Sequence, residues 1–426
     1  MYYKMKIIIV GAGLSGLSTA IALRKFIPTS QSLEVKIYDN INPATGQATE
    51  QESSNVATSQ LGAGLGLEAN GIRVLDNLDP TLKSKVYAAG FPCTHFTWKT
   101  AGDWLLGREY VDVLPISRPF LINCLQETLP AGVVIHQKVA RVITRQGKKP
   151  VVQFEDESPD ETADLVIGAD GIRSTVRRDL FGEDEKYRPQ YAGICAVGGV
   201  LDVPLPKHLL DNPTMVFYMG STGVFGYTGL TQADKNKLLY WSVYETDLPG
   251  RGLKLDHDLM IQQIRERHGD WTDPLIRQCL QKANLDNVYP IFVMPDLPYW
   301  GRDGCVLVGD AVHALPPRSG QGASQAFEDG EALGLLLSGY LEKGYDTNEA
   351  ISRSILGLFE IRAGRVQRIR ADAMRWKDPK MPMSWLKTCG LYITLFILVR
   401  VNRVLSFFRR GESWNVRDAV SKYLKR

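Results

Sequence analysis

The sequence of 426 residues has little of what marks a secreted, metal-binding or nucleic-acid-binding protein. Its six cysteines are scattered and form no Cys-x-x-Cys pair, which argues against a zinc site and against a disulfide framework. Lys and Arg number 50 and Asp and Glu 47, so the formal charge of +3 is too small to indicate a nucleic-acid partner. We therefore expect no bound metal and no nucleic acid.

Long apolar runs are also missing. The most apolar stretch, at 391–401, is interrupted at Arg400 and falls short of the ~18 residues that a membrane-spanning helix requires. The N-terminal segment is apolar too briefly for a signal peptide. With 44% apolar and 23% charged residues, the composition is typical of a globular protein, which we expect to be cytoplasmic.

What the sequence does contain begins with a strand–helix–strand unit. The apolar run MKIIIV (5–10) leads into GAGLSG, a helical pattern covers 15–26, and an alternating strand (33–39) ends in an acid. In GxGxxG, the glycines permit a tight turn, an approach to pyrophosphate and close helix–strand packing, and the acid accepts hydrogen bonds from a ribose. The unit predicts a dinucleotide site, for NAD(P) or FAD, formed by Gly11, Gly13, Leu14, Ser15, Gly16 and Asp39.

Two later segments have the same strand-then-glycine character. DLVIGADGIRSTVR (164–177) places Asp170 and Gly171 directly after an apolar strand. VLVGDAVHALPPRSGQGASQAFEDGEAL (306–333) follows its strand with Gly309 and Asp310, two prolines, and a Gly-Gln-Gly turn that opens a helix. A second GxGxxG motif does not occur.

These segments resemble the DG and GD motifs of the single-component (group A) FAD-dependent monooxygenases, which have the para-hydroxybenzoate hydroxylase-like fold. GAGLGLEANGIRVLDNL (62–78) and ISRPFLINCL (116–125) are similar to the same family, and the resemblance covers roughly residues 5–370 in ordered pieces. It implies that FAD is the cofactor and that NADPH or NADH is a transient reductant. It also implies that O2 forms a flavin C4a-hydroperoxide, which hydroxylates or epoxidises an aromatic or other electron-rich, hydrophobic small molecule.

The resemblance assigns roles to individual residues. Asp310, after Gly309, would bind the ribityl or ribose part of FAD, and Arg118 and Asp170 match other cofactor contacts. Reduced flavin carries negative charge, which backbone N–H groups at a helix start can stabilise. We expect those donors at Gly320, Gln321, Gly322 and Ala323. Pro317, which lacks an N–H and has a fixed φ, would form a rigid wall beside the ring and is a candidate catalytic residue.

The middle of the chain is rich in strands and aromatic residues. The predicted fold is therefore α/β, with a Rossmann-like FAD-binding domain, an inserted and mostly antiparallel β-sheet substrate domain, and a C-terminal helical segment. The expected ranges are 1–80, 100–185 and 301–375 for the first domain, 81–99 and 186–300 for the second, and 376–426 for the third. The polar stretch 41–55 is predicted to be a loop.

Aromatic residues of the middle section are the candidates for substrate binding. We expect Phe217, Tyr227 and Trp241 to face the substrate, and Tyr227, which has glycines nearby, to supply a polar or catalytic contact. Trp241 and Tyr244 have opposite parity, so at most one of them faces the cavity. Many members of the family carry an arginine where this chain has Val197–Gly199, and this departure puts in doubt any mechanism that uses an arginine there to hold or ionise the substrate. An indole or a polyketide-type metabolite would suit such a site.

Several alternatives remain open from the sequence. A flavin-dependent oxidase or reductase would share the fold, and an NAD-dependent dehydrogenase without flavin would share only the first motif. The apolar and basic residues of 384–426 suit either a helical cap on the FAD-binding domain or a segment that contacts a membrane peripherally. The sequence leaves the oligomeric state open.

Overall fold

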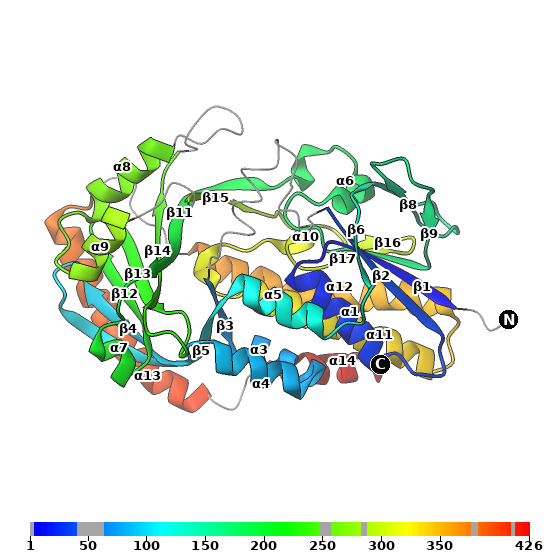
Figure 1. Ribbon diagram of the computed structural model, residues 1–426, viewed down its shortest axis with the longest axis horizontal. Helices are drawn as coiled ribbons and strands as arrows, with labels where there is room; N and C mark the ends of the chain where they lie inside the picture. The colour runs from blue at the N-terminus through cyan, green and yellow to red at the C-terminus, as the bar shows by residue number, and fades with distance from the viewer. Residues whose placement is uncertain (1–3, 41–63, 248–256, 283–287, 376–381, 410–413) are drawn as a thin grey trace.

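The computed structural model describes residues 4–40, 64–247, 257–282, 288–375, 382–409 and 414–426, so the loop predicted at 41–55 lies outside the described residues. Figure 1 shows two lobes, each built on its own sheet. In the described residues the first sheet has six strands, in the order β16 (Gly301–Arg302), β17 (Cys305–Leu307), β10 (Leu165–Gly168), β1 (Met5–Val10), β2 (Leu33–Asp39) and β6 (Val134–His136). All pairs are parallel except β16–β17, as in a doubly wound fold.

The second sheet has eight strands in the part of the chain that the structure describes. Their order is β15 (Val288–Val293), β11 (Gln190–Asp202), β14 (Lys237–Glu245), β13 (Gly223–Gly229), β12 (Thr214–Gly220), β4 (Cys93–Thr100), β5 (Leu105–Ser117) and β3 (Gly64–Glu68). Its neighbours are antiparallel except β12 and β4. A small third sheet joins β7 (Val139–Ile143), β8 (Val151–Phe154) and β9 (Glu161–Thr162).

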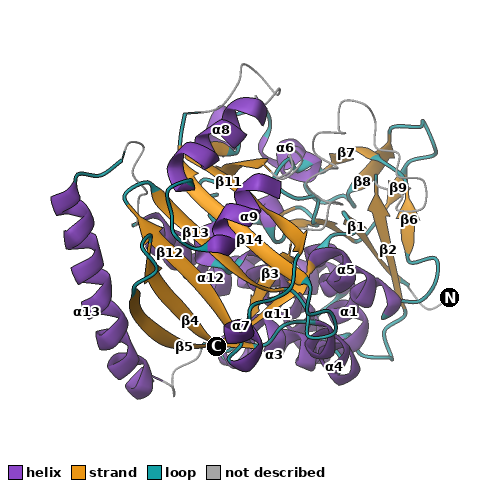
Figure 2. Ribbon diagram, turned by 60° about the vertical axis from the view of Figure 1, so that its left-hand side comes forward, coloured by secondary structure: helices purple, strands orange, loops and turns teal. Residues whose placement is uncertain are grey.

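Helices cover both sheets. The first lobe contains α1 (Leu14–Phe26), α3 (Ala69–Leu78), α4 (Pro80–Ala89), α5 (Arg118–Glu127), α6 (Thr175–Phe181), α10 (Asp310–His313), α11 (Gly322–Glu342), α12 (Thr347–Met374) and α14 (Val416–Leu424). The second contains α7 (Lys207–Asp211), α8 (His257–His268), α9 (Pro274–Lys282) and α13 (Trp385–Arg409). Figure 2 shows α8 and α9 over one face of the large sheet and α13 along its edge.

The core of the first lobe forms where apolar strands meet close-packed helices. The MKIIIV strand β1 is buried on both faces between β10 and β2, which explains its continuous apolar run. Behind it α1 and α11 pack closely, because a Cβ at Gly330 would lie 2.8 Å from Thr19 Oγ1. This packing fixes the N-terminal ends of both helices at the same edge of the sheet.

The structure differs from the predicted domain boundaries at three elements. Strands β3 and β5, expected in the FAD-binding domain, pair into the large sheet, while Leu82 and Val86 of α4, expected in the substrate domain, pack in the first core. The cause is the length of β5, which places Leu114 and Ile116 in the first core and Val113 in the second. The two lobes therefore share a strand.

The C-terminal segment divides into two helices with different partners. Helix α14 packs on α11, where Arg417 Nε pairs with Glu331 Oε1 at 2.7 Å, so it caps the first lobe. Helix α13 packs instead on β5 of the second lobe. Among the described residues, none of the helices has the length and apolar character needed to cross a bilayer. Five of the six cysteines are buried, and Cys389 of α13 is half-buried.

Candidate active site

Three segments that are distant in the sequence meet at the carboxyl ends of β1, β10 and β17. A Cβ at Gly11 would lie 2.5 Å from the carbonyl oxygen of Ala169, and one at Gly309 would lie 2.6 Å from Ser15 Oγ. Arg177 Nη1 also donates to the Ala311 carbonyl at 2.7 Å. The predicted motifs around Gly11, Asp170 and Asp310 are therefore in direct contact, at the edge where parallel sheets bind their ligands.

The first motif has the geometry of a pyrophosphate-binding turn. Gly11 has a φ of 106°, and a Cβ at Gly16 would lie 1.9 Å from the Gly11 carbonyl oxygen, so both positions require glycine. A Cβ at Gly13, in contrast, would meet no atom within 4 Å among the described residues. The space beside Gly13 lies at the N-terminus of α1, where backbone N–H groups attract phosphate. Asp39 Oδ2 accepts from the Ala12 N–H at 2.6 Å, which brings the predicted ribose-binding carboxylate to the turn.

Polar groups around this turn are buried without partners, and their positions fit an FAD. Ser15 Oγ in α1 and Arg118 Nε at the start of α5 are both buried with no hydrogen-bond partner among the described residues. Asp310 is exposed at the start of α10, where its carboxylate is free to meet a ribityl chain. Asp170 uses only one carboxylate oxygen: its Oδ2 accepts from the N–H groups of Thr175 (2.7 Å) and Val176 (3.2 Å) at the start of α6, while its Oδ1 is buried without a partner among the described residues. Burial raises the pKa of the Asp170 carboxyl.

The third motif shapes the start of α11. Pro317 is exposed and begins a single 3₁₀ turn (Pro317–Ser319), Gly320 is left-handed with a φ of 63°, and Gln321 is the N-cap of α11. A Cβ at Gly322 would meet nothing within 4 Å in the described part of the chain, while the adjacent Ala323 packs against the core. The N–H groups of Gly320 and Gln321, predicted as flavin donors, instead donate to the Pro317 carbonyl at 3.0 Å and to Ser319 Oγ at 3.2 Å, because the tight turn brings these acceptors within reach. The N–H groups of Gly322 and Ala323 remain the expected donors at the start of α11.

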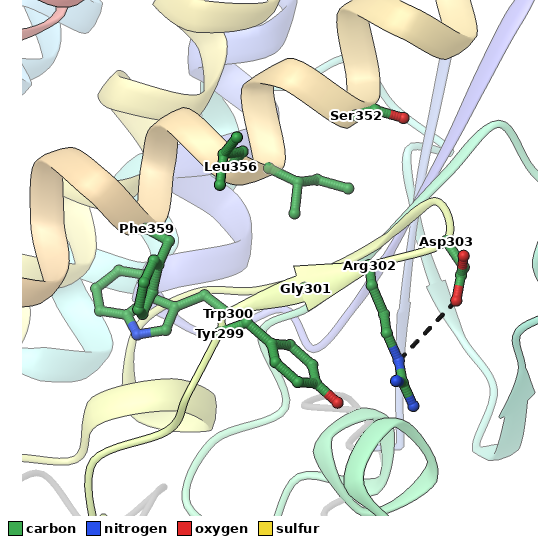
Figure 3. Close-up of a pocket in the computed structure, with 9 residues that line it drawn as sticks. Tyr299, Trp300, Gly301, Arg302, Asp303, Ser352, Leu356 and Phe359 are labelled. Atoms are coloured by element: carbon green, nitrogen blue, oxygen red, sulfur yellow. Dashed lines mark ion pairs between the residues drawn. The ribbon is translucent and has the colours of Figure 1, made fainter. Parts of the chain in front are cut away.

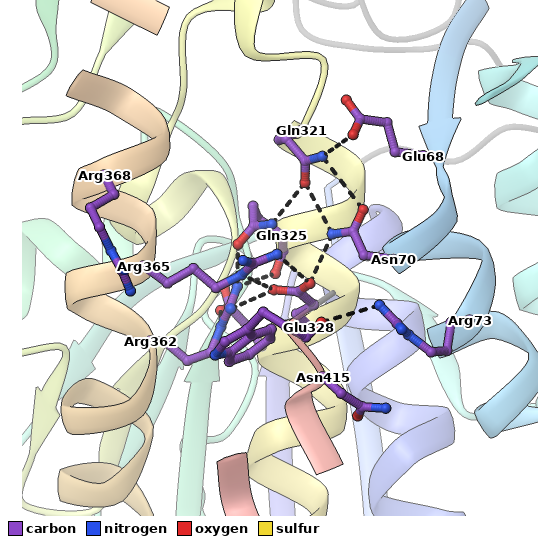
Figure 4. Close-up of polar contacts among 12 residues, drawn as sticks. Glu68, Asn70, Arg73, Gln321, Gln325, Glu328, Arg362, Arg365, Arg368 and Asn415 are labelled. Atoms are coloured by element: carbon purple, nitrogen blue, oxygen red, sulfur yellow. Dashed lines mark hydrogen bonds and ion pairs between the residues drawn. The ribbon is translucent and has the colours of Figure 1, made fainter. Parts of the chain in front are cut away.

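A buried ionic cluster holds that helix end in place (Figure 4). Arg362 of α12 is fully buried and donates to Asp329 Oδ1 at 2.9 Å, to Glu328 Oε2 at 2.5 Å and to Gln325 Oε1 at 2.6 Å. Asp329 Oδ2 also accepts from the Gly309 N–H at 2.9 Å and lies 2.6 Å from His313 Nε2, so His313 has a packing role. Burial opposes ionisation of Asp329, but His313 and Arg362 outweigh it and hold the pKa of Asp329 below its usual range.

Beside the cluster lies a pocket of about 400 Å3 that reaches from the start of α11 to the large sheet. Its wall includes Glu68, Gln321, Phe96 and Trp414. Gln321 Nε2 donates to Glu68 Oε2 at 2.5 Å, and a Cβ at Gly320 would lie 3.0 Å from Glu68 Oε1. Burial is the main cause that raises the pKa of the Glu68 carboxyl. The titratable Glu68 carboxyl therefore lies next to the Gly320 turn, where the flavin is predicted to bind.

An aromatic wall lies on the face of the large sheet that is turned toward this loop. Trp98 of β4 stacks on Phe217 of β12, with ring centroids 4.7 Å apart, and Phe217 meets Trp241 of β14 edge-on at 5.4 Å. Phe96 completes this aromatic wall, at 5.2 Å from Phe217, and also lines the Glu68 pocket. The wall is thus formed by Phe96, Trp98, Phe217 and Trp241.

Glycines make room for the indole of Trp241 in this wall. A Cβ at Gly226 would lie 2.4 Å from the Trp241 ring, and one at Gly198 would lie 2.7 Å from the Tyr240 carbonyl oxygen. The Val197–Gly199 stretch pairs with β14 at Gly198 and Trp241, so it is part of the floor under Trp241. Parity along β14 places Trp241 and Tyr244 on opposite faces, as predicted, and only Trp241 lies in the wall.

Tyr227 does not share this face, which corrects its assignment as a substrate or catalytic residue. Phe217 pairs with Gly226, so the next residue of β13 points to the other side, where α8 and α9 cover it. The Tyr227 side chain is fully buried, and its hydroxyl donates to Asp273 Oδ2 at 3.0 Å. Burial raises the pKa of Tyr227 far above its usual value.

Sequence reasoning missed several residues that shape the site. Phe96 and Trp98 alternate on one strand, a signal for a shared face that the pattern HFTWKT carries. Glu68 and Arg362 have no comparable signal, because the first lies at a strand end and the second is one arginine among many on α12. The partner of Glu68 is about 250 residues away in the sequence, and the partners of Arg362 are about 35 residues away.

A second cavity, of about 240 Å3, lies between β16 and α12 (Figure 3). Tyr299, Trp300 and Phe359 line it, with the pair Arg302–Asp303 at its rim (Nε–Oδ2 3.9 Å). None of its residues belongs to the three motifs, so it is separate from the candidate active site.

Comparison with known proteins agrees with this geometry. Residues 118–348, more than half of the chain, match the family model for an FAD binding domain, and residues 9–68 match an NAD(P)-binding Rossmann-like domain. The 6-hydroxynicotinate 3-monooxygenase of Pseudomonas fluorescens is 27% identical over 401 residues, which cover 89% of this chain and 94% of that protein.

Solved structures show the same fold. Klebsiella pneumoniae HpxO, complexed with FAD and uric acid, superposes with a TM-score of 0.74 at 19% identity. The match covers 95% of this chain and 98% of the HpxO chain. A salicylate hydroxylase substrate complex has a TM-score of 0.71 at 20% identity, and the match covers 98% of this chain and 97% of that chain. FAD is therefore the cofactor and NAD(P)H the reductant. The chain belongs to the family of single-component FAD-dependent monooxygenases with the para-hydroxybenzoate hydroxylase-like fold.

Proposed function

We propose that this monooxygenase transfers one oxygen atom from O2 to an apolar aromatic molecule or a similarly electron-rich one, by hydroxylation or epoxidation. Indole and polyketide-type compounds, expected from the sequence, fall within this class. The observation that carries the proposal is the aromatic wall of Phe96, Trp98, Phe217 and Trp241, which faces the start of α11. Flat aromatic surfaces of this kind stack on planar apolar ligands.

The chain would hold FAD through the residues already placed around the three motifs. Gly11, Gly13 and Ser15 would contact the pyrophosphate, Asp39 a ribose, and Asp310 the ribityl chain. When bound, the flavin supplies the activation of O2, and the protein supplies orientation and exclusion of water. The N–H groups of Gly322 and Ala323 at the start of α11 would stabilise negative charge on the ring, and Pro317 remains our candidate for a rigid wall beside it.

Glu68 is our candidate for the group that accepts a proton from a substrate hydroxyl. It lines the same pocket as Phe96, and Gln321 fixes its carboxylate next to the Gly320 turn. A carboxyl with a raised pKa is a better proton acceptor than an ordinary one, and removal of a phenolic proton makes the ring more reactive toward an electrophilic oxygen.

The proposal is tested by measuring whether labelled oxygen from O2 is incorporated into the product. Enzyme loaded with FAD is supplied with NADPH, 18O2 and a panel of hydroxylated aromatic compounds, and products are measured by mass spectrometry. We expect one 18O atom in the product and faster NADPH oxidation in the presence of the substrate. A product that forms without the label would instead identify an oxidase or a reductase on the same fold.

Apolar substrates of this class partition into membranes. We therefore propose that the enzyme acts at a membrane surface, which it contacts peripherally through its C-terminal segment. The support is that α13 packs on β5, where Gly107 pairs with Trp98 of the aromatic wall. Membrane contact through α13 would place the wall close to dissolved substrate.

A further inference from the structure

Helix α13 is attached to the large sheet by one side only. Leu395 and Val399 are buried against β5, where a Cβ at Gly107 would lie 2.7 Å from Val399 Cγ1. Arg400 Nη1 donates to the Leu106 carbonyl at 2.7 Å, and the Met383 N–H donates to the Ser221 carbonyl at 2.9 Å. These contacts define the orientation of the helix.

The other side of α13 exposes large apolar side chains. Trp385 is 76% exposed, Leu386 73% and Ile393 61%. At about 100° per residue, the exposed residues share one broad arc that leaves out the side of the buried pair Leu395 and Val399. We call this arc the α13 face; it consists of Trp385, Leu386, Ile393, Phe396, Ile397 and Val401.

The apolar surface continues onto the turn between β4 and β5. Trp104 there is 80% exposed and Leu105 is 53% exposed. The turn leads directly into β5, whose Leu106 carbonyl accepts from Arg400 of α13, so the turn and the helix are attached to the same strand. Contiguous apolar surface of this size indicates a binding partner, because water-exposed proteins rarely leave such patches open.

Charge indicates which partner covers it. Residues 382–411 contain five basic residues and no acidic one: Lys387, Arg400, Arg403, Arg409 and Arg410. The rest of the chain has 45 basic and 47 acidic residues, so the net positive charge of the protein lies entirely in this segment. A second copy of the chain would bring like charges together, whereas an anionic lipid surface would attract them.

We propose that the α13 face docks on the boundary between headgroups and acyl chains of an anionic phospholipid leaflet, with the helix parallel to the membrane plane. Apolar side chains enter the boundary, Trp385 and Trp104 lie at headgroup level, and the exposed Lys387 contacts lipid phosphates. The segment lies on the membrane and does not cross it, in keeping with the hydropathy of the described helices.

The experiment uses the full chain loaded with FAD and measures sedimentation with phosphatidylcholine vesicles, with and without phosphatidylglycerol. We expect the protein to pellet with the anionic vesicles and to be released by high salt. The triple variant Trp385→Ser/Ile393→Ser/Ile397→Ser should lose about tenfold or more in partitioning. The matched control Tyr87→Ser/Leu259→Ser removes exposed apolar residues elsewhere and should pellet like the wild type.

Three outcomes would overturn the inference. The wild type could stay in the supernatant with anionic vesicles, or the triple variant could pellet equally well. Light scattering could also show a dimer that the triple variant abolishes, which would identify a second copy as the occupant. Bound FAD, measured by absorbance, verifies folding in every sample. The vesicle assay contains neither substrate nor NADPH, so a negative result would not bear on the proposed oxygenation. In the same way, absence of 18O from the product would not bear on the lipid contact.

Discussion

At the scale of single residues, two glycines of the first motif have different roles: one is needed for packing of the protein itself, and the other leaves space for a ligand. Gly16 is needed by the protein itself, because a Cβ there would overlap the Gly11 carbonyl oxygen at 1.9 Å. Gly13 is needed only by a ligand, because a Cβ there meets no described atom within 4 Å. The two positions therefore make a matched pair for testing where the cofactor lies.

We expect Gly13→Ala to leave the melting temperature of the FAD-free protein unchanged and to weaken FAD binding by about tenfold or more, because the new methyl group enters the space for the pyrophosphate. Gly16→Ala should lower the melting temperature even without FAD. Thermal unfolding of the FAD-free protein and fluorescence titration with FAD measure the two effects. Unchanged FAD affinity in Gly13→Ala would place the pyrophosphate elsewhere.

Arg362 shows how a fully buried charge becomes indispensable. Its guanidinium is the partner of Asp329 and Glu328, which are themselves buried. Replacement by Met would remove the one cation that both carboxylates share and leave only His313 beside Asp329 and Arg365 beside Glu328, among the described residues, so we expect a loss of about 3–5 kcal/mol in the free energy of unfolding. Arg368→Met is the control, because this exposed arginine of the same helix bonds the Gly364 carbonyl of its own helix. Equal stability of the two variants in urea unfolding would refute the role of the cluster.

Glu68 should make stability depend on pH. Burial raises its pKa in the folded state, so its protonated form fits the site best. Its contribution to stability is complete below the pKa of an unfolded glutamate, about 4.3, and is lost as the pH rises through the raised value.

We therefore expect Glu68→Gln to melt at a higher temperature than the wild type at pH 8, with a difference that disappears near pH 4. The glutamine keeps a carbonyl oxygen that can accept from Gln321. Asp112→Asn, in the same pocket, is the matched control. Parallel pH profiles of Glu68→Gln and wild type would show that the Glu68 carboxyl does not titrate in this way.

At the scale of elements, the sequence predicted strands and helices well where local pattern decides them. The apolar strand before Gly11, the helix after it and the helix that opens at Gly322 all occur, because glycine and apolar periodicity act locally. The face of each strand was harder to predict. Tyr227 was chosen for its glycine neighbours, but pairing with β12, which is not local, decides which way it points.

The sequence left open whether the C-terminal segment is a cap or a membrane contact, and its two helices differ in their contacts. Helix α14 has the contacts of a cap: Arg417 pairs with Glu331, and Leu424 packs against Gly339 of α11. Just before it, Trp414 covers Arg365, whose guanidinium lies 4.2 Å from the ring centroid. Helix α13 has the exposed face described above.

We expect a chain that ends at residue 413 to lose several degrees in melting temperature and to bind FAD more weakly, because α11 loses its cover and we propose that its N-terminus lies beside the flavin. Differential scanning calorimetry and FAD titration measure this. The point variant Tyr423→Ala, which removes a contact with Gly357 of α12, should give a smaller shift of the same sign. A truncated chain with wild-type stability would exclude the cap.

At the scale of the whole molecule, β5 joins the two lobes into one mechanical unit. Its residues enter both cores, and the aromatic wall of one lobe meets the cofactor edge of the other. Lobes that share a strand cannot unfold independently without breaking its pairing on one side.

FAD bound to the first lobe should therefore stabilise the second. At a free FAD concentration one hundred times Kd, we expect a gain of about 2.7 kcal/mol in the free energy of unfolding. The near-ultraviolet circular dichroism of Trp98 and Trp241 should change in the same transition as flavin release. A second-lobe signal that melts at the same temperature with and without FAD would show that the lobes are uncoupled.

The burial of the cysteines allows selective labelling with a spectroscopic probe. Burial raises the pKa of Cys93 to about 12, of Cys195 to about 11 and of Cys279 to about 12, so at neutral pH these thiols resist maleimides. Cys389, on α13, is more accessible than the others. An environment-sensitive dye would thus attach first to the helix in question, and its emission colour would report, without further mutagenesis, whether that helix rests in water or in lipid.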